Sequence, residues 1–272
     1  MAKTRLDNLL LARGMVSSRE KARAIILAGE VKVNGLRVDK PGAGFPDEVE
    51  ITVESSSPRY GSRGGLKLEK AIKEFAIDFM DRTVLDVGAS TGGYTDCALQ
   101  HGARRVFAVD VGYGQLDWTL RNDSRVVCLE KTNIRYFKPE QLGRQVDIIT
   151  VDVSFISTAL VFPVIKDMLT AQGNIISLIK PQFEAGRNKV GKKGVVRDRT
   201  VHREVLLGCI TAAAGENLNC AGITYSPITG PQGNIEFFIH LRKTTVSPEL
   251  EIDKTVASVV DEAHQQLGGK GS

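Results

Sequence analysis

The chain has 272 residues, and its 36 lysines and arginines stand against 32 aspartates and glutamates, giving a net charge of only +4. Hydrophobic residues make up 42% of the sequence, which suits a packed core and excludes a disordered or fibrous protein. The positive charge is concentrated at the start, because residues 1–40 hold nine basic and four acidic side chains. This excess suggests a polyanionic partner, although a merely soluble surface is the alternative that charge alone leaves open.

The cysteines and histidines show no pattern of a disulfide framework or a metal site. Four cysteines lie far apart without a C-x-x-C pair, and four histidines lack metal-ligand spacing. We therefore expect reduced thiols, no metal and a cytoplasmic location. No secretory signal pattern opens the sequence, and the most apolar stretch, 148–165, is interrupted by Asp152 and Pro163. Its uncharged part is too short to span a bilayer, so we expect no membrane association.

Residues 1–58 are predicted to form a small α+β domain. Apolar spacing predicts two helices, the second opened by a capping box of Ser17 and Glu20. Asn34-Gly35 between alternating runs is a strong hairpin signal. The expected elements are helices over 5–12 and 17–29, a hairpin over 31–38 and a third strand over 49–53.

A linker over 59–65 is expected to lead into a larger domain over 66–245, followed by a C-terminal helix and tail over 246–272. Strands are predicted over 83–87, 105–110, 125–129, 146–152, 174–180, 219–226 and 235–242. Helices are predicted over 66–77, 92–101, 114–121, 155–170 and 200–215. This alternation predicts a doubly wound, mostly parallel sheet of the α/β class. Only a short turn joins the last two strands, so we expect them to pair antiparallel at the sheet edge, as in class I methyltransferases.

The segment Asp86–Gly93 carries the most information in the sequence. An apolar strand-like run ends in a loop of small residues, and a helix-compatible run follows directly. Such a turn offers free backbone N–H groups and a helix N-terminus to a ligand, and its glycines allow close approach. Asp110, at the end of the next strand, is placed to accept hydrogen bonds from ribose hydroxyls. The arrangement suits S-adenosylmethionine better than a dinucleotide; an ordinary strand–helix turn without a ligand is the alternative.

Four further polar residues lie at strand ends or helix starts: Lys67, Asp152, Lys180 and Glu236. Ligands of open α/β sheets bind at the carboxyl ends of strands. We hypothesise that Lys180 removes the proton of a ribose 2′-hydroxyl, with Lys67 nearby favouring the neutral amine. Asp152 and Glu236 would orient the lysines and the ribose for in-line methyl transfer. Four unrelated salt-bridge residues at the surface are an equally open alternative.

A basic segment over 184–199 follows Lys180 directly, with glycines between its charges. Its place beside the hypothesised site favours contact with an RNA backbone over a merely solvated loop. Together with the basic start of the chain, it gives a set of expected RNA-contacting residues: Arg5, Arg19, Lys21, Lys32, Arg63, Arg187, Lys189, Lys192 and Lys193.

These motifs together resemble the TlyA family of hemolysin-like rRNA methyltransferases. The resemblance covers nearly the whole chain. It is carried by the segments 5–7, 18–22 and 31–35, which are similar to an S4 signature, and by 62–68, 86–93, 151–155, 178–184 and 233–236. It implies an S4-like RNA-binding domain joined to an FtsJ-like, class I S-adenosylmethionine-dependent methyltransferase domain with a seven-stranded sheet.

The resemblance also implies roles for individual residues. The family's Lys-Asp-Lys-Glu tetrad falls on Lys67, Asp152, Lys180 and Glu236. The donor-binding positions fall on Asp86, Gly88, Ser90, Thr91, Gly92, Gly93, Asp110, Thr132 and Asn133. The implied activity is 2′-O-methylation of a cytidine in 16S or 23S rRNA, or in both, on ribosomal subunits. The alternatives are a membrane-active hemolysin and an rRNA-binding assembly factor without catalysis, and the sequence leaves the oligomeric state open.

Overall fold

The computed structural model describes residues 3–16, 18–27, 31–53, 60–191, 193–230, 232–243 and 251–268. The chain divides into two compact units, Met1–Arg59 and Tyr60–Ser272. Residues 60–65, expected in the linker, therefore belong to the second unit. Tyr60 is buried in that unit's core, and helix α3 (Gly64–Phe75) already begins at Gly64. The expected cap at Ser17 lies outside the described residues.

The first unit has the predicted order of helices and strands. Two helices pack together, and a three-stranded antiparallel sheet of order β3-β2-β5 lies with them. Its elements are β1 (Thr4–Arg5), α1 (Leu6–Ala12), α2 (Arg19–Leu27), β2 (Val31–Val33), β3 (Leu36–Arg37), β4 (Gly44–Phe45) and β5 (Ile51–Val53). Asn34 and Gly35 form the predicted hairpin turn with positive φ angles of 49° and 78°. The core consists of leucines, isoleucines and valines from both helices and the sheet.

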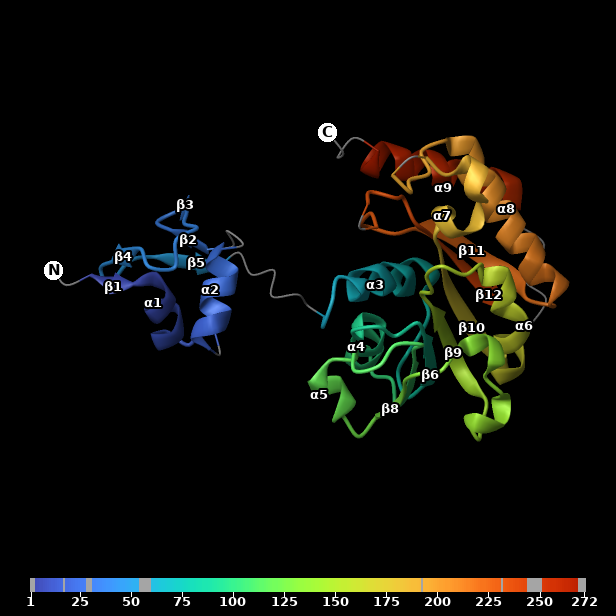
Figure 1. Ribbon diagram of the computed structural model, residues 1–272, viewed down its shortest axis with the longest axis horizontal. Coiled ribbons are helices and arrows are strands. Elements are labelled where there is room, and N and C mark those ends of the chain that lie inside the picture. The colour runs from blue at the N-terminus through green and yellow to red at the C-terminus, as the bar shows by residue number, and fades with distance from the viewer. Residues whose placement is uncertain are drawn as a thin grey trace. The chain divides into compact units, whose positions relative to one another are not determined.

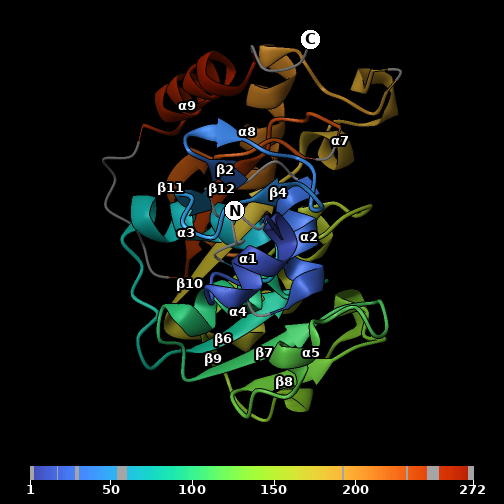
Figure 2. The same cartoon turned by 90° about the vertical axis from the view of Figure 1, so that its left-hand side faces the viewer.

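The second unit is built on a seven-stranded sheet of order β11-β12-β10-β9-β6-β7-β8. Its strands are β6 (Thr83–Val87), β7 (Arg105–Val109), β8 (Val126–Leu129), β9 (Val146–Val151), β10 (Leu169–Ile179), β11 (Asn219–Tyr225) and β12 (Phe237–Arg242). The pairs from β8 to β10 are parallel, whereas β12 is antiparallel to both β10 and β11. The predicted class I methyltransferase topology is therefore confirmed, and Figure 2 shows β9, β6, β7 and β8 side by side in this order.

Helices cover both faces of this sheet, as Figure 1 shows. Side chains alternate along each strand, so Val84 packs with α3, α4 (Gly93–Gln100) and α5 (Trp118–Arg121). Leu85 packs toward the other face, with α6 (Phe162–Ile165), α8 (Arg199–Gly215) and α9 (Ile252–Leu267). Burial on both faces explains why these strands are almost continuously apolar in sequence.

Two predicted helices are shorter than expected. The helix predicted over 155–170 was wrong as one element: the segment forms η3 (Thr158–Leu160), α6 and η4 (Lys166–Met168), and Leu169 already begins β10. Pro163 lies in the first turn of α6, because a proline lacks the N–H that a helix interior requires. The helix predicted over 114–121 shrinks to α5, which is capped by the Asp117 side chain.

Candidate active site

Sheet register brings three of the four hypothesised catalytic residues to one edge of the second unit. Lys180 directly follows β10 and Glu236 directly precedes β12, whose Phe237 is paired with Ile179. Asp152 directly follows β9, which lies on the other side of β10. The fourth residue, Lys67, comes from the first turn of α3.

The four side chains form two ion pairs. Lys180 Nζ lies 2.6 Å from Asp152 Oδ1 and donates a hydrogen bond of 2.9 Å to Ser154 Oγ. Lys67 Nζ donates to Glu236 Oε2 at 2.6 Å, and both side chains are buried. Each ammonium group therefore meets a carboxylate. The sequence hypothesis had placed Lys67 as the partner that acts on Lys180, whereas its direct contact is Glu236.

Tyr94 shows that the two ion pairs are neighbours. This tyrosine, in the first turn of α4, is 4% exposed. Burial raises its pKa well above the usual 10, and the charges of Asp152, Glu236 and Asp86 raise it further. Its hydroxyl has no hydrogen-bond partner among the described residues. One buried side chain thus lies in the field of both catalytic carboxylates, a feature that the sequence indicated only by its place after the glycine loop.

A hollow of about 570 Å³ opens at the same edge of the sheet. Its volume suits a nucleoside-sized ligand. The Asp110 carboxylate accepts backbone hydrogen bonds from Ser90 (2.8 Å) and Gly112 (2.7 Å), which join the loops after β6 and β7. Six of the predicted site residues line this hollow: Gly88, Ser90, Asp110, Thr132, Asn133 and Asp152.

Asp86 does not line the hollow, although the sequence placed it in the donor site. Its carboxylate is buried in β6 and accepts hydrogen bonds from Thr95 Oγ1 (2.7 Å) and Thr150 Oγ1 (3.0 Å). Burial raises the pKa of Asp86 to about 6, and these two hydrogen bonds limit the rise. Asp86 therefore ties α4 and β9 to β6, behind the loop.

The glycines of the loop serve packing rather than open approach by a ligand. A Cβ at Gly88 would collide with the carbonyl oxygen of Asp152. At Gly92 it would meet Leu116 and Leu120, and at Gly93 it would meet Ser62 and the start of α3. Thr91, Gly92 and Gly93 are not among the residues that line the hollow. The sequence expected free access at these positions, but protein atoms occupy it.

Several expected RNA-contacting residues already have protein partners. Arg5 binds the Asp7 carboxylate through two hydrogen bonds (3.0 and 2.8 Å), and Arg19 Nε adds a third of 3.3 Å. These arginines, foremost Arg5 through its hydrogen bonds, lower the pKa of Asp7 to about 2. Lys189 pairs with Glu204.

The other basic candidates lie elsewhere on the two units. Arg63, Arg187 and Lys193 are exposed, and Lys32 is half-buried in β2. The side chains of Lys21 and Lys192 lie outside the described residues. Exposure leaves the first three arginine and lysine side chains accessible to a polyanion.

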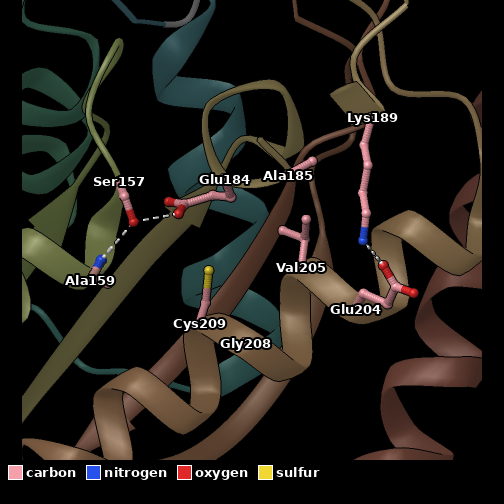
Figure 3. Close-up of a pocket in the computed structure, with 9 residues that line it drawn as sticks. All are labelled: Ser157, Ala159, Glu184, Ala185, Lys189, Glu204, Val205, Gly208 and Cys209. Carbon is pink, nitrogen blue, oxygen red and sulfur yellow. Dashed lines mark hydrogen bonds and ion pairs between the residues drawn. The ribbon is translucent and has the colours of Figure 1, made fainter. Parts of the chain in front are cut away.

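A second hollow, of about 280 Å³, lies between the start of η3 and α8 (Figure 3). Glu184 points into it, but its carboxylate accepts hydrogen bonds from Ser157 and Thr158. Burial, reinforced by the charge of Glu184, raises the pKa of the nearby Cys209 thiol to about 12, so this thiol is not nucleophilic. The second hollow therefore offers no reactive group.

Two surveys cover the described ranges only. No helix there has both the length and the apolar character needed to cross a membrane. No group of three or more histidine, cysteine, aspartate or glutamate side chains in those ranges could hold a metal ion.

The sheet order, the loop after β6 and the hollow at the strand ends define a class I methyltransferase. A family model described as FtsJ-like methyltransferase matches residues 60–243, and a model of the S4 domain matches residues 4–43. YqxC of Bacillus subtilis is 49% identical, with 98% of this chain and 96% of that protein covered.

The 16S/23S rRNA (cytidine-2′-O)-methyltransferase TlyA of Mycobacterium tuberculosis is 43% identical, with 89% of this chain and 91% of that protein covered. A solved structure of a hemolysin-named protein from Streptococcus thermophilus is similar with a TM-score of 0.76 and 42% identity, covering 98% of each chain. The chain belongs to the TlyA family of FtsJ-like methyltransferases, and the resemblance seen in its motifs is confirmed.

Proposed function

We propose that this protein transfers a methyl group from S-adenosylmethionine to the 2′-hydroxyl of a cytidine in ribosomal RNA. The observation that carries the proposal is the pair of neighbouring lysine–carboxylate contacts at the sheet edge that also holds the 570 Å³ hollow. The choice of cytidine and of rRNA rests on the name of the Mycobacterium tuberculosis relative. The activity would place the protein in the cytoplasm with the ribosomal subunits.

The residues that line the hollow fit the methyl donor. Asp110 has two carboxylate oxygens that each accept one backbone hydrogen bond, which leaves lone pairs for ribose hydroxyls. Thr132 and Asn133 would lie beside the adenine, and Gly88 and Ser90 beside the amino-acid part. Bound S-adenosylmethionine supplies an electrophilic methyl group.

The two lysines have different tasks in the proposed reaction. Asp152 and Ser154 fix Lys180 Nζ, and the neutral amine takes the proton of the 2′-hydroxyl as its oxygen attacks the methyl carbon. Lys67 stays in its buried pair with Glu236 and supplies a fixed positive charge beside the reacting oxygen. Such a charge, held before the reaction begins, stabilises the negative charge that develops on the attacking oxygen.

The test is the transfer of labelled methyl groups to isolated ribosomal subunits, followed by mapping of ribose methylation in both rRNAs. The wild-type protein should methylate a cytidine, and Lys180→Ala should lower the rate at least about 100-fold while S-adenosylmethionine still binds. A folded Lys180→Ala protein with the wild-type rate would disprove the assignment. Leakage of liposomes, measured in parallel, would instead support the membrane activity that the name of the Streptococcus relative suggests.

A further inference from the structure

The loop between Asp152 and η3, residues 153–157, is held in a conformation that it would not adopt by itself. We call this segment the arch. Phe155 within it has a φ of 63°, in the left-handed region that bulky residues rarely occupy, and its side chain is 90% exposed. Such a backbone persists only where its surroundings fix it. The contacts that fix the arch therefore also fix the position of Asp152 at its start.

The arch is fastened at both ends to one short element, α7 (Pro181–Glu184). At the start of the arch, Lys180, the residue before α7, contacts Asp152 and donates to Ser154. At its other end, the Glu184 carboxylate accepts three hydrogen bonds: from Ser157 Oγ (2.6 Å), from the Thr158 backbone N–H (2.8 Å) and from Thr158 Oγ1 (3.0 Å). Figure 3 shows Glu184 directed toward Ser157.

These three hydrogen bonds are the whole function that the structure gives to the Glu184 charge. In the ranges that the structure describes, no lysine or arginine forms an ion pair with it. Thr158 is 2% exposed, so its N–H and hydroxyl have little access to water as a substitute acceptor. Hydrogen bonds to a carboxylate are stronger than those between neutral groups, and losing this acceptor would leave two buried donors unpaired.

We propose that Glu184 is a positioning residue for methyl transfer: it fixes the arch so that Asp152 and Ser154 hold Lys180 Nζ toward the substrate oxygen. The proposal rests on the function proposed above for Lys180. Because α7 is a single turn, a shift of the arch away from Glu184 changes the Asp152–Lys180 contact directly. A small misplacement of a reacting group costs rate rather than affinity.

The experiment compares Glu184→Ala, Glu184→Gln and Thr158→Val with the wild type. Glu204→Gln is the matched control, because Glu204 lines the same hollow as Glu184 but contacts Lys189 and not the arch. Glu184→Ala should lower kcat about tenfold, with KM for rRNA and Kd for S-adenosylmethionine within about twofold of the wild type. Glu184→Gln should recover part of this loss, because its amide oxygen can still accept from the Thr158 N–H.

Two further measurements separate positioning from a general structural role. Amide hydrogen exchange of residues 153–158 should become faster in Glu184→Ala while exchange in β9 and β10 stays unchanged. In a double-mutant cycle, Glu184→Ala and Thr158→Val should have less than additive effects on kcat, because they remove the same contact.

An unchanged kcat in Glu184→Ala, or an equal loss in Glu204→Gln, would overturn the proposal. So would a loss confined to KM, to donor binding or to global stability. Hydrogen exchange needs no substrate, so it tests the arch even if rRNA proves to be the wrong substrate. Absence of methylation by the wild-type protein would instead refute the proposed function.

Discussion

Replacement of Lys67 by methionine should separate the stabilising role of its buried ion pair from its catalytic role. At 2.6 Å between Nζ and Glu236 Oε2, the attraction is about 6 kcal/mol at an effective dielectric constant of about 20. Desolvation of both charges offsets much of this attraction, since the two side chains are only 11% and 1% exposed. Lys67→Met removes the attraction but leaves a buried carboxylate, so it should destabilise the second unit by about 3–5 kcal/mol.

The double variant Lys67→Met/Glu236→Leu should regain most of this stability, because it removes the unpaired charge and fills the space with apolar groups. Methylation should nevertheless stay at least about 100-fold below the wild-type rate, because the fixed charge beside the reacting oxygen is lost. Lys73→Met, an exposed position on the same helix, is the control and should change neither property.

Urea unfolding followed by the fluorescence of Trp118, the one tryptophan of the sequence, measures the stability of the second unit. Transfer of labelled methyl groups to ribosomal subunits measures the rate. A double variant that is stable and as active as the wild type would refute the catalytic role of the pair. A single variant that loses less than about 1 kcal/mol would refute the energetic argument.

Two further predictions concern pH and stability. Asp7→Asn should destabilise the first unit by about 2 kcal/mol at pH 7, because the native pKa of Asp7 is about 2 against an ordinary 3.8. Its stabilisation is present above pH 4 and is lost as the pH falls toward 2, and amide exchange in α1 should show it; equal exchange in the two proteins would contradict it. Burial and the charge of His264 lower the pKa of His202 from 6.5 to about 4. Stability of the second unit should therefore fall by up to about 3 kcal/mol between pH 6.5 and 4. Urea unfolding of His202→Gln should show a flatter slope, and an unchanged slope would exclude His202 as its cause.

The periodicity of apolar residues sufficed to predict most of the fold. Strands that are buried on both faces are continuously apolar, and the short turn between β11 and β12 forces their antiparallel pairing. The hairpin at Asn34-Gly35 follows from local backbone preferences alone. The segment 155–170 was mispredicted because its apolar residues have helical spacing. Its course depends instead on Pro163 and on the distant acceptor Glu184, which caps η3.

The sequence alone determined which residues stand at strand ends, since an apolar run that stops at a charged residue must stop near solvent or a partner. It thereby indicated Asp152, Lys180 and Asp110. Only the tertiary structure decided their partners: Lys67 with Glu236, Lys180 with Asp152 and Ser154, and Glu184 with the far end of the arch. Such pairings join residues up to 169 positions apart, and they depend on strand order and register, which no local pattern encodes. For the same reason the loop glycines, which suggested a ligand's approach, proved to accommodate neighbouring protein atoms.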